Sequence, residues 1–180
     1  MFRSTLVSLY TLVLAGCATL DPSVCGRFEQ SRQSLRYDTL YRYSDIDTRR
    51  AEQSFKPQRD VTPAIVRWYT LRANVTEIQP CEHLYLYKEL YLQRQAGDEL
   101  VIEETREFYT ANGRRIATRK EDVTRQLKRS GYYSAAVPLP IPETAPDGTY
   151  KVVSRLTARK NGGKESVLAS ASAEFRVAPR

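Results

Sequence analysis

The chain has 180 residues, of which 41% are hydrophobic, and its 28 Lys and Arg against 21 Asp and Glu give a formal net charge of +7. This length suits one domain with an extension and argues against two large domains. A single His, with no paired Cys spacing, argues against a zinc site, and we expect neither a metal nor a cofactor. Twelve Tyr against one Met and one Trp favour strands, because Tyr fits a pleated, half-buried surface.

The first sixteen residues have the pattern of a secretory signal. Arg3 is the only charged side chain among the first twenty residues, and residues 6–14 are mostly apolar. A basic start, a short apolar core and small residues at the end are typical of a cleavable signal. The apolar run falls far short of the roughly 20 residues that cross a bilayer as a helix, so we do not expect a permanent span.

The end of this signal, Leu14-Ala15-Gly16-Cys17, resembles the lipobox of bacterial lipoproteins. In that family the cysteine receives a diacylglycerol thioether, the signal is cut just before it, and the new amine is acylated. The resemblance implies a signal peptide at residues 1–16 and a lipid on Cys17, and the alternative is an ordinary signal with an accidental cysteine. Ala18 replaces the Asp that favours inner-membrane retention, so the resemblance implies the periplasmic face of the outer membrane.

Two further cysteines remain if Cys17 carries lipid. Cys25 and Cys81 would then meet in an oxidising compartment, and we expect a disulfide between them. Such a bridge closes a loop of more than fifty residues, worth up to about 4 kcal/mol in the chain-entropy model. The alternatives are two unpaired cysteines, or a nucleophile made by Cys81 with the only imidazole, His83.

The residues after the signal have no regular pattern. Phe28, Leu35 and Tyr41 could share one helical face. We therefore predict a lipidated tether with an irregular or short-helical segment over residues 17–60, and a folded domain over residues 61–180.

The clearest strand covers residues 83–93, where side chains alternate at period two. One side of the strand carries leucines, which are Leu84, Leu86, Leu90 and Leu92. The other side carries tyrosines, which are Tyr85, Tyr87 and Tyr91. Because alternate side chains of a strand point to opposite faces, we expect the leucines to face a core.

Later segments read as further short strands. Asn112-Gly113 is a strong hairpin signal, because both residues accept positive φ. Residues 119–130 could either continue as a strand or form a short helix, and the helix would start with a capping box of Thr118 and Glu121. Pro138 and Pro140 place the extended segment around them at a sheet edge or crossover.

The C-terminal part resembles the final hairpin of bacterial immunoglobulin-like and related extracellular domains. The matching residues are Pro146-Asp147-Gly148-Thr149-Tyr150-Lys151-Val152, the turn Asn161-Gly162-Gly163, and Phe175-Arg176-Val177. With the short strands and Gly-rich turns, the resemblance implies a mainly β chain folded as an antiparallel immunoglobulin-like β-sandwich. The cysteine and tryptophan pattern of antibody domains is not evident around Trp68. The resemblance concerns the fold and leaves function open.

Acidic residues on one predicted strand are the main candidates for chemistry. Glu103 and Glu107 share a face and could act as an acid/base pair or hold a cation, with Glu104 beside them. The alternative is a solvated strand face in which Arg106 and a basic neighbouring strand supply the partners. We favour this alternative and expect no catalytic residue.

A basic segment is the most distinctive surface feature. It contains seven cations, Arg114, Arg115, Arg119, Lys120, Arg125, Lys128 and Arg129. One hypothesis is a patch that faces an anion such as a phospholipid headgroup, a lipopolysaccharide phosphate or an acidic subunit. The other is an edge strand protected by charge against pairing with a second chain.

We therefore expect a non-enzymatic binding or scaffold module, held to the membrane through Cys17, and one form of this role is a subunit of an envelope assembly. Exposed tyrosines and the basic segment are the expected contacts, because Tyr and Arg are favoured at interfaces. The expected partner is an envelope protein, or an anionic lipid or glycan, and export argues against nucleic acid. One alternative is a carrier of a lipid or apolar ligand, which needs a hollow between the sheets. Another is a carboxylate-dependent glycan-modifying enzyme.

Overall fold

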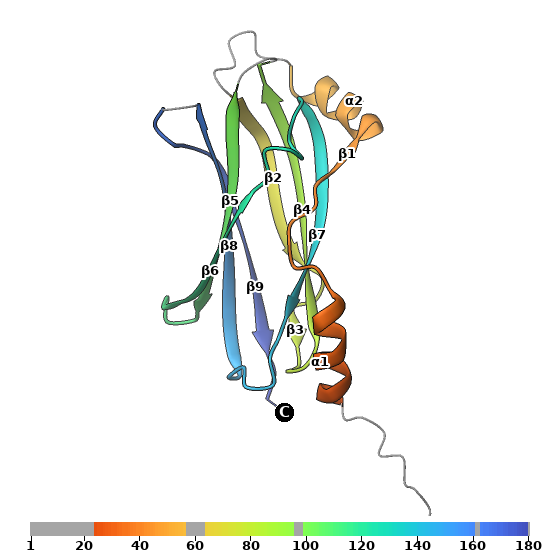
Figure 1. The fold of residues 1–180 in the computed structure, drawn as a ribbon, viewed down its shortest axis with the longest axis vertical. Helices are drawn as coiled ribbons and strands as arrows, with labels where there is room; N and C mark the ends of the chain where they lie inside the picture. Colours follow the sequence, from red (N-terminus) through yellow and green to blue (C-terminus); the bar gives the residue numbers. More distant parts are fainter. Residues whose placement is uncertain (1–23, 57–63, 96–98, 161–162, 180) are drawn as a thin grey trace, which may run out of the picture.

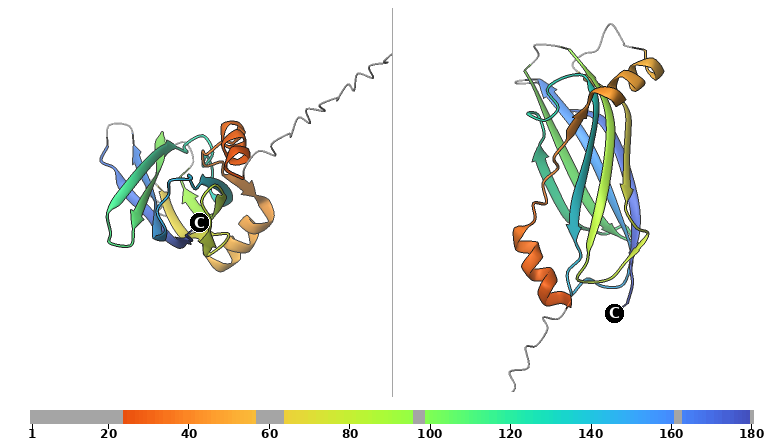
Figure 2. Two further views of the ribbon diagram at one scale, coloured as in Figure 1. Left: turned by 90° about the horizontal axis from the view of Figure 1, so that it is seen from below. Right: turned by 90° about the vertical axis from the view of Figure 1, so that its right-hand side faces the viewer.

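The computed structural model describes residues 24–56, 64–95, 99–160 and 163–179, and Cys17 lies outside them. Two β-sheets face each other, with both helices on the side of the smaller sheet (Figures 1 and 2). The four-stranded sheet has the order β1 (Arg42–Ser44), β7 (Gly131–Pro140), β4 (His83–Arg94) and β2 (Ala64–Ala73). The five-stranded sheet has the order β3 (Glu77–Ile78), β9 (Ser166–Val177), β8 (Gly148–Lys160), β5 (Leu100–Thr110) and β6 (Arg115–Asp122). The helices are α1 (Val24–Ser34) and α2 (Asp45–Ser54).

The strand order is that of an immunoglobulin fold. Strands A, B and E of this fold correspond to β2, β4 and β7, which lie in the four-stranded sheet. Strands C, C′, F and G correspond to β5, β6, β8 and β9, which lie in the five-stranded sheet. Each of these strands therefore lies in the sheet that the immunoglobulin fold requires. β3 pairs in parallel with β9, whereas the other pairs of described strands are antiparallel. β1 comes from the N-terminal segment and takes the place beside strand E that strand D normally fills. The predicted immunoglobulin-like β-sandwich is confirmed.

A tyrosine corner marks the start of β8. The Tyr150 hydroxyl donates a hydrogen bond of 2.7 Å to the carbonyl oxygen of Pro146, four residues upstream. This contact is a hallmark of the immunoglobulin fold, in which the second cysteine of antibody domains follows the tyrosine by two residues. Here that position holds Val152, which is fully buried. The Asn161-Gly162 part of the second predicted turn lies outside the described residues.

The alternation over residues 83–93 is confirmed. The four leucines of β4 are fully buried between the sheets, while Tyr85 and Tyr87 are exposed on the outside. Tyr91 also lies on the outer side, but it is buried because α2 and the following Phe55 cover it, with the Phe55 and Tyr91 rings 5.7 Å apart. α2 is fixed to β7 by Thr48, whose hydroxyl accepts a hydrogen bond from the Tyr132 amide.

The N-terminal segment differs from the predicted helix. α1 ends at Ser34, Leu35 is exposed, and Tyr41 is buried in extended chain, so the helical face shared by Phe28, Leu35 and Tyr41 is wrong. Contact with the sandwich, rather than helical periodicity, decides which of these residues are buried. Of the described helices, neither is long and apolar enough to span a bilayer.

Of the two alternatives for residues 119–130, strand or short helix, the structure shows a strand that continues to Asp122 and is followed by a turn. Thr118 and Glu121 both lie on β6 and pair with β5, so they form no capping box. After Asp122 the chain makes one turn, in which the Leu127 amide donates to the Val123 carbonyl oxygen, and both side chains are buried.

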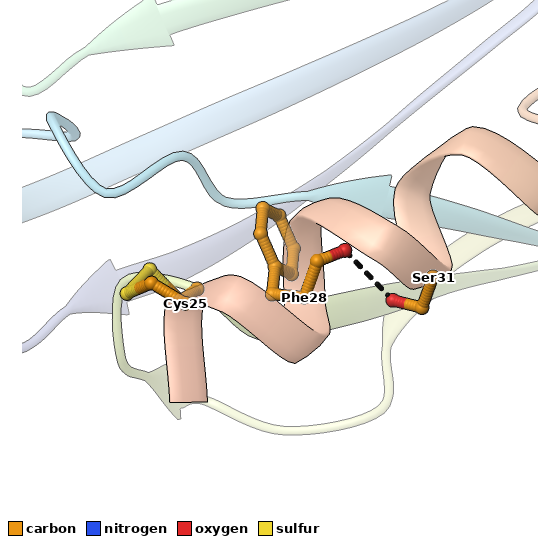
Figure 3. The surroundings of a disulfide bond; sticks show 4 residues. Cys25, Phe28 and Ser31 are labelled. Carbon is orange, nitrogen blue, oxygen red and sulfur yellow. Dashed lines mark hydrogen bonds between the residues drawn. A yellow bond between two sulfur atoms is a disulfide. The ribbon is translucent and has the colours of Figure 1, made fainter. Parts of the chain in front are cut away.

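The predicted disulfide between Cys25 and Cys81 is present. It joins the first turn of α1 to the loop before β4, and the two Cα atoms are 5.0 Å apart. Phe28 lies beside it on α1 (Figure 3) and packs on His83 with ring centroids 4.8 Å apart. A Glu143 carboxylate oxygen lies within 4.8 Å of both sulfurs, but sulfurs joined in a disulfide are not thiolate ligands.

Candidate functional site

Aromatic side chains gather on the outer face of the four-stranded sheet. We define the aromatic face as Trp68 on β2, Tyr85 and Tyr87 on β4, and Tyr132 on β7. The exposed fractions of Trp68, Tyr85 and Tyr87 are 36%, 37% and 43%. The Trp68 and Tyr132 rings stack across the sheet with centroids 5.8 Å apart. Exposed aromatic surface of this kind, bordered by polar groups, is typical of a binding face.

A shallow groove crosses the aromatic face between β4 and β7. The small side chains of Ser134 and Ala136 form its floor, and the larger side chains of Tyr87 and Leu40 form its sides. Its volume is about 360 Å³, at the small end of the range for ligand sites. Arg42, Arg72 and Glu89 also line the groove, and the Arg72 guanidinium lies 3.7 Å from the Glu89 carboxylate.

A second hollow, of about 290 Å³, adjoins the other end of the aromatic face. Asp47 and Arg50 of α2 supply its charged groups, and the Trp68 and Tyr132 rings line it. Burial, followed by the nearby Glu89 carboxylate, raises the pKa of Tyr132 to about 12. The Tyr132 hydroxyl, like any tyrosine hydroxyl near neutral pH, is protonated and can act as a donor.

The outer face of the five-stranded sheet is charged instead of aromatic. Glu103 accepts from Lys120 at 2.9 Å, and Glu107 accepts from Arg115 at 2.7 Å. The Arg115 hydrogen bond lowers the pKa of Glu107, so this carboxylate stays ionised near neutral pH. The basic neighbouring strand β6 supplies these partners, as we favoured, but Glu107 is buried and not solvated. Arg106, however, was wrong as a partner here, because it points inward and bonds Glu121.

The predicted basic segment divides between an edge strand and a loop. Arg115, Arg119 and Lys120 lie on β6, which is the edge of its sheet, and each pairs with a carboxylate. The Arg129 guanidinium lies over the Tyr43 ring, 3.6 Å from its centroid. Arg114, Arg125 and Lys128 are exposed and make no ion pair with a described residue. Placement on an edge fits the protective role, and the anion-facing patch stays a prediction.

A polar layer divides the core between the sheets into two hydrophobic clusters. At its centre the Lys88 Nζ lies 2.5 Å from the Glu104 Oε1, and both side chains are fully buried. Hydroxyls surround the pair and come from Thr39, Tyr41, Tyr69 and Ser154. Burial lowers the pKa of Lys88 to about 8. Burial opposes the charge on Glu104, but Lys88 and Ser154 lower the pKa of its carboxyl overall.

The alternative of a nucleophile made by Cys81 and His83 is excluded, because Cys81 is held in the disulfide. His83 instead packs against the N-terminal segment. Its Nε2 lies 3.3 Å from the Tyr37 hydroxyl, and its ring packs on Phe28. Burial lowers the pKa of His83, which keeps the ring neutral in this contact near neutral pH.

Comparisons with known proteins found no matching family model and no matching curated protein. Solved structures that resemble this chain include the C-terminal domain of wzt, with a TM-score of 0.48, 10% identity, and coverage of 81% of each chain. They also include a CARDB domain from Pyrococcus furiosus (TM-score 0.38, 9% identity, 69% of this chain and 100% of that one). A third is the CooA pilin subunit from enterotoxigenic Escherichia coli (TM-score 0.35, 10% identity, 61% and 90%).

Other matched chains are longer, and this chain spans 30%, 27% and 13% of three of them. All of these likenesses are distant. The assignment of the fold therefore rests on the strand order and the tyrosine corner of this chain itself.

Proposed function

We propose that this protein is a lipid-anchored binding module of the bacterial envelope, and that the aromatic face binds an envelope protein. The observation that carries the proposal is the contrast between the two outer faces. The face of the five-stranded sheet is covered by paired charges, such as Lys120 with Glu103. The aromatic face instead exposes Trp68, Tyr85 and Tyr87 next to Arg42 and Arg72.

Residue chemistry supports a protein as the partner. Trp, Tyr and Arg are enriched among the residues that dominate protein–protein binding energy, especially beside a pocket that they help to line. The groove between Tyr87 and Leu40 offers such a pocket for one anchoring side chain. Small Ser134 and Ala136 leave the backbone of β7 open to close approach.

The position of α1 supports access to this face from an anchored molecule. α1 begins at the end of the sandwich where the C terminus also lies (Figure 1). Val24 follows Cys17 by seven positions, so an extended chain between them reaches at most about 25 Å. Lipid on Cys17 would attach this end of the sandwich to the membrane, and the aromatic face runs up the side of the molecule.

Photocrosslinking in living cells tests the aromatic face. A photoreactive amino acid placed at Tyr87 should give one discrete adduct with an envelope protein, identified by mass spectrometry. The same amino acid at Val153, on the outer side of β8, is the matched control and should give none. The purified partner should then bind the wild type and lose at least tenfold in affinity for the Trp68→Ala, Tyr85→Ala variant. Equal adducts at both positions, or unchanged affinity, would contradict the proposal.

A further inference from the structure

An apolar groove of about 320 Å³ opens at the edge between the two sheets, at the end of the sandwich where α1 begins. Phe108, Ile116, Leu139, Ile141, Pro142 and Phe175 form most of its wall. Its described lining includes no charged side chain. Thr144 and Tyr150 contribute the hydroxyls, and the Tyr150 hydroxyl is already bonded to Pro146.

The groove exists because strand D has no full replacement. β1 pairs with β7 only over Tyr132–Ser134. Below β1, the chain at residues 37–41 covers the edge, where the Tyr37 carbonyl oxygen accepts from Arg106 and the Thr39 amide donates to Glu121. Beyond Tyr37 the edge between β7 and β6 is open, and the inner side chains of both sheets line the gap.

Strand β7, which forms part of the groove wall, suits a hydrocarbon ligand better than a peptide that adds as a further strand. An added strand would need backbone N–H groups along the free edge of β7, and proline has none. Pro138 and Pro140 occupy this part of the strand, and Pro142 follows it. A ligand that needs no hydrogen bonds, such as an acyl chain, fits these walls better.

The disulfide fixes the start of α1 beside the groove. Cys25 is bonded to Cys81, and the Cys81 amide donates a hydrogen bond of 2.8 Å to the carbonyl oxygen of Ile141. The Ile141 amide in turn donates to the Glu82 carbonyl oxygen at 3.0 Å. Ile141 is itself part of the groove wall, so the chain that leads back to Cys17 departs from the rim. Cys25 follows Cys17 by eight positions, a reach of at most about 29 Å.

We propose that the groove holds one acyl chain of the lipid on Cys17 of the same molecule. This inference rests on the proposed lipid anchor. Attachment through so short a segment gives the chain a high effective concentration at the groove, which a free membrane lipid lacks. The remaining acyl chains stay in the bilayer, and the docked chain holds the α1 end of the sandwich against the membrane surface.

A photoreactive palmitate tests this inference in the full-length protein. Cells are fed palmitate with a diazirine on its chain and irradiated, and the purified protein is digested for mass spectrometry. We expect adducts within the lipoprotein itself, on the peptides around Ile116 and Leu139. Ile116→Glu should reduce them at least fivefold. Val167→Glu is the control and should leave them unchanged, because Val167 is also an exposed apolar residue but lies at the start of β9, whereas Phe175 and Val177 of the groove lie at its end.

Three outcomes would overturn the inference in distinguishable ways. Label on Cys17 without adducts in the groove means that the anchor exists and the groove does not hold its chain. Equal groove adducts in a Cys17→Ala variant mean that the groove takes a free membrane lipid instead. Failure of the wild-type chain to incorporate any label removes the anchor, and the proposed function fails with it.

Discussion

Lys88 on β4 and Glu104 on β5 form a fully buried ion pair that joins the two sheets, with 2.5 Å between the Nζ and Oε1 atoms. Removing one partner leaves an uncompensated charge in the core. We expect Lys88→Met alone, and Glu104→Leu alone, each to lower the free energy of unfolding by about 3–5 kcal/mol. Urea denaturation of the two variants measures this loss.

The double variant Lys88→Met, Glu104→Leu provides the control for the ion pair. Replacing both partners with apolar side chains removes the buried charges together, so its stability should recover to within about 1 kcal/mol of the wild type. Losses that simply add in the double variant would show that the two side chains stabilise the fold independently of each other.

Gly131 permits the close approach of β1 to the start of β7. Its φ is +151°, and a Cβ atom there would clash with the Tyr43 ring. Gly131→Ala combines backbone strain with this clash, and should lower the free energy of unfolding by about 2–4 kcal/mol. Gly148 has a comparable φ of +138° but open space around the same position. Gly148→Ala should therefore cost clearly less, and equal losses in thermal or urea denaturation would contradict the role of Tyr43.

Glu121 should make folding sensitive to acid. Burial opposes its charge, but Arg106, the Thr39 amide and Arg119 outweigh burial and lower the pKa of Glu121 from 4.5 to about 2. A carboxyl with a lowered pKa in the folded state stabilises the fold fully above pH 4.5, and this contribution is lost as the pH falls toward 2. Glu121→Gln should flatten the fall in unfolding free energy over this range. The exposed Glu174→Gln is the control, and an unchanged slope in Glu121→Gln would refute the assignment.

The tyrosine corner can be tested by removing a single oxygen atom. Tyr150→Phe deletes the hydrogen bond to Pro146 but keeps the ring stacked on Phe175, with centroids 5.7 Å apart. We expect a loss of about 1 kcal/mol in unfolding free energy, the usual net value of one such bond. A Tyr150→Phe variant as stable as the wild type would mean that the corner does not stabilise this domain.

The fold was accessible from the sequence because its strands carry local signals. Alternation of leucines and tyrosines on β4 and the Asn112-Gly113 turn depend only on neighbours in the chain, and both were interpreted correctly. The N-terminal segment was not interpreted correctly, because Tyr41 is buried by β7 and the polar layer, which lie far away in sequence. Long-range contacts of this kind leave no periodicity to detect.

The aromatic face was partly predictable and the polar layer was missed. Tyr85 and Tyr87 followed from alternation, but the same alternation places Lys88 on the leucine side, and that signal could have identified a buried charge. Its partner Glu104 could not be chosen from sequence over Glu103, because the strand phase decides which carboxylate points inward. The apolar groove depends on the missing strand D, which becomes evident only when both sheets are assembled.

One labelling experiment tests whether Cys17 anchors the protein to the membrane. Cells expressing the wild type or Cys17→Ala are fed labelled palmitate, and the label on the protein and its sedimentation with membranes are measured together. We expect the wild type to carry label and to sediment with membranes, and Cys17→Ala to lose both. Label and sedimentation that persist in Cys17→Ala would show that Cys17 does not anchor the protein.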